Sequence, residues 1–156
     1  MVLPITLREI TAETVRAITD LAVREDQPFV ASNAVSLAEA LFCEEAWYRA
    51  IYDGDSPVGF VMLYDETLRP APPANPQVWL WRFMVDAKFQ GKGIGKAALA
   101  LVIDHVRNKG GIARLTTSYV PGPGCPEGFY LKCGFQHTGK VDEGEVVLEL
   151  PLDPAP

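Results

Sequence analysis

The sequence predicts an α/β (α+β) fold in which a mixed central sheet of about seven strands is flanked by about four helices. The first observation is an apolar run at 78–85, which has the length and composition of a buried strand. The second is the glycine-rich turn that follows it at 90–96. The third is the helical spacing of the apolar residues beyond the turn, Leu99, Val102, Ile103 and Val106. With 156 residues, of which 48% are hydrophobic, the chain can form one domain over residues 1–156.

The segments before the central strand are predicted to form both strands and helices. In order, we expect a strand at 3–8, a helix from 11 to about 22, a loop at 24–30, a helix to about 45, and strands at 47–52 and 58–64. Ser36 and Glu39 have the spacing of a capping box, which predicts the start of the second helix. The run at 67–77 contains four prolines and is therefore predicted to be a loop.

The segments after the central helix complete the sheet. We expect a strand at 113–120, a break at the Pro- and Gly-rich run 121–126, a short helix at 127–132, and strands at 136–142 and 145–150. Gly134 suits a left-handed cap at the end of the short helix. Glu143-Gly144 forms the turn of a hairpin. We expect Glu143 and Glu145 beside this turn to be solvated, and contact with an amine is the alternative.

Composition and charge limit the kinds of partner. The net charge of -6 disfavours nucleic acid and anionic membranes and favours cationic ligands. The sequence contains no long uncharged apolar run and no recognisable secretory signal, so we expect a cytoplasmic protein. The three cysteines fit no metal-ligand spacing and are expected to be reduced thiols, and no metal site is predicted.

The glycine-rich turn opens a helix and therefore presents unpaired amides, which suit a phosphate or pyrophosphate. A Walker loop is excluded because Gly91 and Gly95 enclose only three residues and Ala97 follows Lys96. The dinucleotide fingerprint fails because a lysine occupies the position of its third glycine. The remaining pattern is Gln-x-x-Gly-x-Gly, formed by Gln90, Gly93 and Gly95.

These residues resemble those of the GNAT superfamily of acetyl-CoA-dependent N-acetyltransferases. The resemblance depends on the Gln-x-x-Gly-x-Gly turn, on the preceding strand with Asp86, and on the Tyr-x-x-x-Gly-Phe pattern that begins at Tyr130. The order of elements also matches that fold over nearly the whole chain. Within the superfamily the chain is most similar to the bacterial diamine/polyamine (spermine/spermidine) acetyltransferase branch, through short stretches at 26–33, 82–84, 138–139 and 142–145.

The resemblance implies acetyl-CoA as co-substrate and indicates which residues bind it. The turn would hold the pyrophosphate, with the glycines permitting close backbone approach and the two lysines supplying charge, over Gln90, Gly91, Lys92, Gly93, Ile94, Gly95 and Lys96. The end of the strand, Phe83, Met84 and Val85, would face the acetyl group, with amides near Met84 and Val85 polarising its carbonyl.

The resemblance also implies that Tyr130 is the general acid. A phenol titrates near pH ~10 and a thiol near ~8.5, so tyrosine stays protonated and can donate to the departing thiolate. Position alone favours a role for Tyr130 in packing the short helix against the sheet, and the Tyr-x-x-x-Gly-Phe pattern reverses this preference. The loop before it departs from the family pattern, because Pro123 occupies a place where relatives often have asparagine.

The acceptor side is less defined by sequence. Glu25 and Asp26 lie in the loop where this family binds its acceptor, and Trp81 and Trp79 could contact a cation through their rings. A solvated acidic loop and a packed tryptophan are the alternatives. We therefore expect an enzyme that acetylates a small polyamine-like amine by direct attack, and a homodimer is possible in this family. The alternatives are another amine, such as a protein N-terminus, an amino acid or an antibiotic, or a non-enzymatic acyl-CoA sensor.

Overall fold

The computed structural model describes residues 4–27 and 30–152. Within these residues, seven strands form one mixed sheet in the order β1-β2-β3-β4-β5-β7-β6. The strands are β1 (Ile5–Arg8), β2 (Ala46–Asp53), β3 (Ser56–Asp65), β4 (Val78–Val85), β5 (Arg114–Tyr119), β6 (Gln136–Asp142) and β7 (Glu145–Pro151). The helices are α1 (Val15–Thr19), α2 (Asn33–Ala40), α3 (Ile94–Lys109) and α4 (Glu127–Lys132). This arrangement confirms the predicted fold class.

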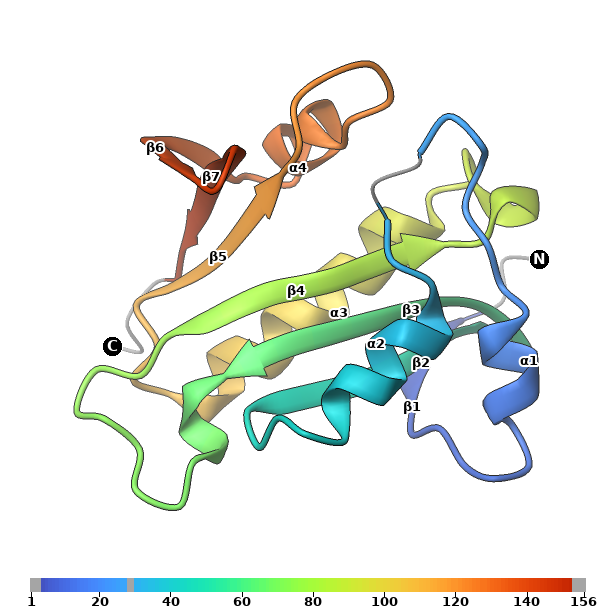
Figure 1. Ribbon diagram of the computed structural model, residues 1–156, viewed down its shortest axis with the longest axis horizontal. Helices are drawn as coiled ribbons and strands as arrows, with labels where there is room; N and C mark the ends of the chain where they lie inside the picture. Colours follow the sequence, from blue (N-terminus) through green and yellow to red (C-terminus); the bar gives the residue numbers. More distant parts are fainter. Residues whose placement is uncertain (1–3, 28–29, 153–156) are drawn as a thin grey trace.

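The centre of the sheet divides where β4 meets β5. Strands β1 to β4 are joined by antiparallel ladders, and so are β5, β7 and β6. Among the described residues, a short parallel ladder joins the two halves, in which Val78 pairs with Leu115 and Trp79 with Thr116. Beyond these pairs the two strands diverge, as Figure 1 shows. We call the opening between residues 80–85 of β4 and 117–119 of β5 the V.

Helix α3 covers one face of the sheet, whereas α1 and α2 lie on the other (Figure 1). Alternation along a strand alone would place Leu80 and Met84 on one face, but the β3–β4 register shifts between them, so the two residues serve different cores. Leu80 packs with Leu99 and Val102 of α3. Met84 packs instead in a second cluster, with Ile18 of α1 and Phe60 of β3.

The predicted ends of the first two helices are wrong. Helix α1 ends at Thr19, before Ala22, because the Ala22 amide donates to the Asp86 carboxylate at 2.9 Å and its carbonyl accepts from the Ala87 amide. These two hydrogen bonds hold Ala22 against the end of β4, so the helix ends before it. Leu3, where the first strand was predicted to begin, lies outside the described residues.

Helix α2 starts four residues before the predicted capping box. Ser32 is the N-cap and accepts from the Val35 amide at 3.2 Å, while Ser36 is fully buried inside the helix. The helix also ends at Ala40, five residues before Glu45. There the backbone already belongs to the sheet, since the Glu45 carbonyl accepts from the Asp65 amide at 2.7 Å.

Candidate active site

The wall of the V is the free edge of β4. A register shift in the β3–β4 ladder pairs Met62 with Arg82 and Leu63 with Leu80, so that Trp81 is left as a bulge. At the narrow end, the Thr117 hydroxyl donates to the Leu80 carbonyl at 3.2 Å. Past this bond, no strand among the described residues pairs with the β5-facing side of β4.

Backbone alternation determines which groups enter the V. The Asp86 amide donates to Val58 of β3 at 2.8 Å. Since successive amides of a strand point to opposite sides, the Met84 amide also faces β3, and those of Phe83 and Val85 face the V. The contact with the acetyl carbonyl that the sequence assigns to Met84 and Val85 is therefore geometrically available from Phe83 and Val85.

The N-terminus of α3 lies beside the V. Gly91 and Gly93 have φ of 79° and 80°, the left-handed region that glycine adopts without strain. Among the described residues the structure shows no acceptor for the backbone amides of 91–96. A Cβ added at Gly95 would lie 3.4 Å from the Phe129 ring of α4. This open, donor-rich turn fits the pyrophosphate of a CoA molecule, with Lys92 and Lys96 exposed next to it.

Gln90 has a structural contact that the sequence did not reveal. Its side-chain amide donates to the Val85 carbonyl at 2.8 Å and to the Gln27 side chain at 3.0 Å. Asp86 also connects the two segments, because its carboxylate accepts from the Ala22 amide and, at 3.0 Å, from the Lys88 amide. Together these bonds fasten the loop between α1 and α2 to the end of β4.

Tyr130 is buried in α4, with 6% of its surface exposed. Its ring packs between Phe129 and Phe135, with centroids 5.5 and 5.4 Å away. Burial raises the pKa of Tyr130 to about 12, and the nearby Thr117 side chain acts in the opposite direction. The phenol is therefore protonated at neutral pH, and it lies next to the residue that closes the narrow end of the V.

The predicted acceptor loop reaches the rim of the V with its backbone. A Cβ added at Gly124, whose φ is 80°, would collide with the Asp26 carbonyl, so the loop before α4 and the loop after α1 touch here. Glu25 and Asp26 are themselves exposed, and Asp26 pairs with Arg24 at 3.2 Å. The structure thus brings the loop to the site, while both carboxylates face solvent.

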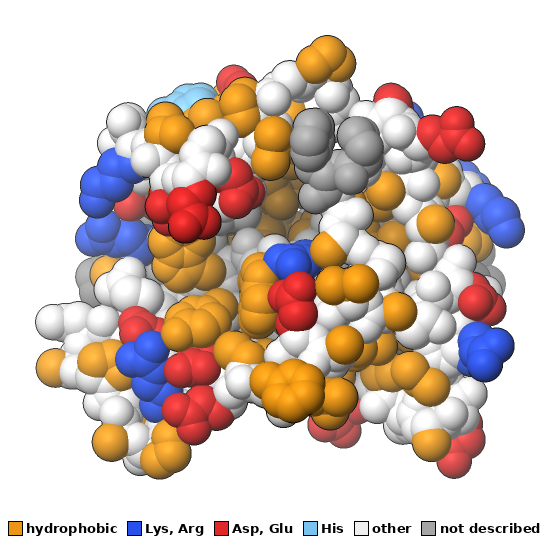
Figure 2. All heavy atoms as spheres, in the orientation of Figure 1, with side chains coloured by type: hydrophobic (Ala, Val, Ile, Leu, Met, Phe, Trp, Pro, Cys, Tyr) orange, Lys and Arg blue, Asp and Glu red, His pale blue; other side chains and the backbone are white. Residues whose placement is uncertain are grey.

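Trp81 is half-buried on the face that carries α2. Its ring lies edge-on to Tyr64, with centroids 6.3 Å apart, and the Arg82 guanidinium lies 5.3 Å from its centroid. Arg82 in turn pairs with Glu39 of α2 at 3.3 Å. Sequence reasoning missed this pair, although Glu39 and Arg82 lie in segments that it had examined. Figure 2 shows this face of the molecule, hollowed between the α1–α2 side and the β5–β7 side.

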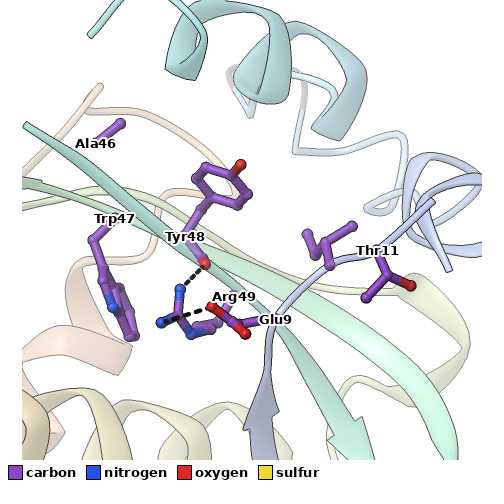
Figure 3. Close-up of a pocket in the computed structure, with 7 residues that line it drawn as sticks. Glu9, Thr11, Ala46, Trp47, Tyr48 and Arg49 are labelled. Atoms are coloured by element: carbon purple, nitrogen blue, oxygen red, sulfur yellow. Dashed lines mark hydrogen bonds and ion pairs between the residues drawn. The ribbon is translucent and has the colours of Figure 1, made fainter. Parts of the chain in front are cut away.

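A second hollow lies away from the V. It is a cavity of about 320 Å³ between β2 and the chain that follows β1 (Figure 3). Arg49 crosses it, donating to the Tyr48 carbonyl at 2.7 Å and pairing with Glu9 at 3.8 Å. Neither the cofactor turn nor Tyr130 lines this cavity, so it is not part of the candidate site.

Neither a metal site nor a membrane span is found in the described part of the chain. No group of three or more His, Cys, Asp or Glu within residues 4–27 and 30–152 could hold a metal ion. Over the same residues, no helix has the length and apolar character needed to cross a membrane.

A helix N-terminus with unpaired amides, a free strand edge and a buried phenol form an arrangement suited to a transferase that binds a phosphate-containing thioester. Comparison with known proteins identifies the class more closely. The model of the acetyltransferase (GNAT) family matches residues 8–135, and the chain belongs to this family. It is therefore an acetyl-CoA-dependent N-acetyltransferase.

Individual relatives agree with this assignment. The spermine/spermidine N(1)-acetyltransferase of Bacillus subtilis (strain 168) is 33% identical over 154 residues, which cover 92% of this chain and 96% of that protein. An acetyltransferase from Thermus thermophilus has a similar structure, with a TM-score of 0.72 at 19% identity over 97% of this chain and 99% of that one. The PaiA N-acetyltransferase from Thermoplasma acidophilum, solved with coenzyme A, gives 0.71 at 18% identity over 96% and 100%. At these identities the two structures show a shared fold.

Proposed function

We propose that the chain transfers the acetyl group of acetyl-CoA to a primary amine of a small polyamine-like acceptor by direct attack. The observation that supports a polyamine as the acceptor is the similarity to the relative named spermine/spermidine N(1)-acetyltransferase, which matches over nearly the whole chain at 33% identity. The acidic net charge of -6 supports it, because a polyamine is a polycation at neutral pH.

The cofactor half of the site is assigned to backbone groups. The amides of residues 91–96 hold the pyrophosphate, with Lys92 and Lys96 adding charge. Phe83 and Val85 present their amides to the pantetheine arm and the acetyl carbonyl, while Met84 fixes β4 in the second core cluster. A donor aimed at a developing oxyanion typically contributes about 3 kcal/mol to transition-state stabilisation.

In the reaction the free amine attacks the thioester carbon, a C–N bond forms and the C–S bond breaks. The departing thiolate takes the phenolic proton of Tyr130, whose pKa of about 12 keeps it protonated until that moment. The attacking nitrogen releases its own proton to water or to an acidic side chain on the acceptor face. Glu25, Asp26 and Trp81 belong to that face and attract the cationic acceptor.

A thiol-release assay with acetyl-CoA and a panel of amines tests the proposal. The panel should contain 1,4-diaminobutane, spermidine, spermine, an amino acid, an aminoglycoside and a peptide with a free N-terminus. We expect turnover with the polyamines and little with the others. Turnover only with a non-polyamine would change the acceptor and keep the chemistry, whereas CoA binding without turnover of any amine would point to an acyl-CoA sensor.

A further inference from the structure

The starting observation is a row of side chains along β7. Val146, Leu148 and Leu150 pack in the core beneath α3. Because side chains alternate along a strand, Glu145, Val147 and Glu149 occupy the opposite face, which is the face of α1 and α2. This row therefore consists of a carboxylate, an apolar side chain and a second carboxylate.

A cavity of about 480 Å³ lies along this row. It is lined by Val147 and Glu149 of β7, by Asp142 of β6, and by Trp79 and Thr116, the last pair of the parallel ladder before the V opens. Trp79 lies between Val78 and Leu80, both of which pack toward α3, so its ring is on the acceptor face. The cavity therefore extends from the narrow end of the V.

Glu145 lies nearer to the wide end of the V. Its carboxylate accepts from the Ser118 hydroxyl of β5 at 3.3 Å, and Ser118 is two residues beyond the ladder pair at Thr116. Four residues of strand separate Glu145 from Glu149, which corresponds to about 13 Å. An extended triamine or tetramine has comparable length, whereas a short diamine does not reach across this span.

Carboxylates lie both in the cavity and farther along β7. Asp142 and Glu149 line the cavity together with two positive residues, Arg114 and Lys140, whereas Glu145 lies outside it, beside Ser118. Arg114 pairs with Glu149 at 3.4 Å, and its side chain is 51% exposed. An exposed ion pair of this kind contributes little, so an ammonium group can take the place of the guanidinium at small cost. The apolar surfaces of Val147 and Trp79 suit the alkyl segment between two ammonium groups.

We propose that Glu145 and Glu149 are two ammonium subsites of the acceptor groove and that Glu149 selects acceptors by length. Glu145 faces the amine nearest the V, and Glu149 binds the remote ammonium of a triamine or tetramine. This inference rests on the proposed polyamine acceptor and adds a determinant of which polyamine is preferred.

Steady-state kinetics on Glu149→Gln with 1,4-diaminobutane, spermidine and spermine tests the proposal. We expect kcat/KM for spermidine and spermine to fall about tenfold, mainly through KM, with the diamine changed less than twofold. Glu145→Gln should lower kcat/KM for all three amines. Glu143→Gln is the matched control, because Glu143 is exposed on the same hairpin and its removal changes the charge equally.

Arg114→Gln separates substrate binding from a structural role of the ion pair. If Glu149 binds the acceptor, the loss of its competitor should lower KM for spermine, the opposite of the effect of Glu149→Gln. Equal effects of both variants, or a Glu149→Gln effect that is the same for every amine, would overturn the inference. Either of these two outcomes overturns only the inference about Glu149, because the wild-type enzyme would still acetylate polyamines. If the wild type acetylates none of them, the proposed acceptor fails first, and this inference falls with it.

Discussion

Replacing Tyr130 with phenylalanine removes a single hydroxyl group from the centre of the proposed mechanism. The ring stays in place, because its contacts with Phe129 and Phe135 do not involve the oxygen. The loss of the hydroxyl beside Thr117 should change the free energy of unfolding by no more than about 1 kcal/mol. The lost proton donor should lower kcat about 10²–10⁴-fold, equivalent to roughly 3–5 kcal/mol of activation free energy.

The assay is thiol release at saturating acetyl-CoA, with CoA affinity measured separately by calorimetry. Tyr119→Phe is the matched control, since Tyr119 is a buried tyrosine with 4% exposure whose hydroxyl donates to Glu127 at 2.7 Å. We expect the control to keep kcat within about twofold and to lose a similar amount of stability. Tyr130→Phe should keep CoA affinity and folding but lose turnover.

The reasoning about Tyr130 would be refuted by a kcat within about twofold of wild type under conditions in which chemistry limits the rate. A slow product-release step could mask the loss, so a single-turnover measurement is needed with both variants. An unchanged single-turnover rate would leave water as the proton source and make Tyr130 a packing residue of α4.

Further predictions concern the turn, the acceptor loop and the buried groups. Gly93→Asp should abolish CoA binding by calorimetry, whereas Gly93→Asn, which has the same strain at φ 80°, should retain part of it. The pair Glu25→Gln and Asp26→Asn should raise the acceptor KM a few-fold and weaken its salt dependence, with CoA affinity unchanged. Asp86→Ala leaves the amides of two loops without their acceptor and should lower the free energy of unfolding by about 1–3 kcal/mol in urea titrations. Burial raises the pKa of Tyr130 to about 12 in the fold, against about 10 when unfolded, so the fold should lose up to about 3 kcal/mol of stability as the pH rises from ~10 to ~12 and none from this group below pH ~10. Tyr130→Phe should therefore flatten the loss of stability measured over that range.

The centre of the fold was predictable because its signals are local. The apolar run Val78–Val85, the glycines after it and the stripe of α3 each determine their element without distant partners. The hairpin between β6 and β7 was predicted for the same reason, since Glu143-Gly144 is a turn with positive φ at both residues.

The first two helices were mispredicted because distant contacts set their ends. The chain leaves α1 where Ala22 bonds to Asp86, a residue 64 positions away in sequence. Residues beyond α2 join the sheet because the Glu45 carbonyl accepts from Asp65. No periodicity within a helix reports such bonds, and a capping box at Ser36 fits the local pattern equally well.

The two halves of the candidate site also differ in how far the sequence predicts them. Its cofactor half is one continuous stretch from β4 to α3, so a single motif was enough to propose it. Its proposed acceptor half collects residues from the loop between α1 and α2 and from β4, β5 and β7, and these meet through strand order and register. The alternation of Glu145, Val147 and Glu149 is visible in the sequence, but the face to which it points follows from the sheet order β5-β7-β6.

In the proposed site, strand register therefore governs acceptor recognition more directly than cofactor binding. Side chains alternate with a period of two, so a slip of one residue in the β6–β7 ladder would turn Glu145 and Glu149 toward the core and Leu148 toward the groove. The ladder shifts register between His137 and Val141, where Gly139 has a φ of 81°. This irregularity lies in β6, so the regular ladder between β5 and β7 fixes which residues of β7 face the groove. The proposed pyrophosphate contacts, by contrast, are backbone amides of residues 91–96, which lie outside the hairpin. The two halves of the site can thus change independently, and acceptor preference can vary on this scaffold while acetyl-CoA binding stays constant.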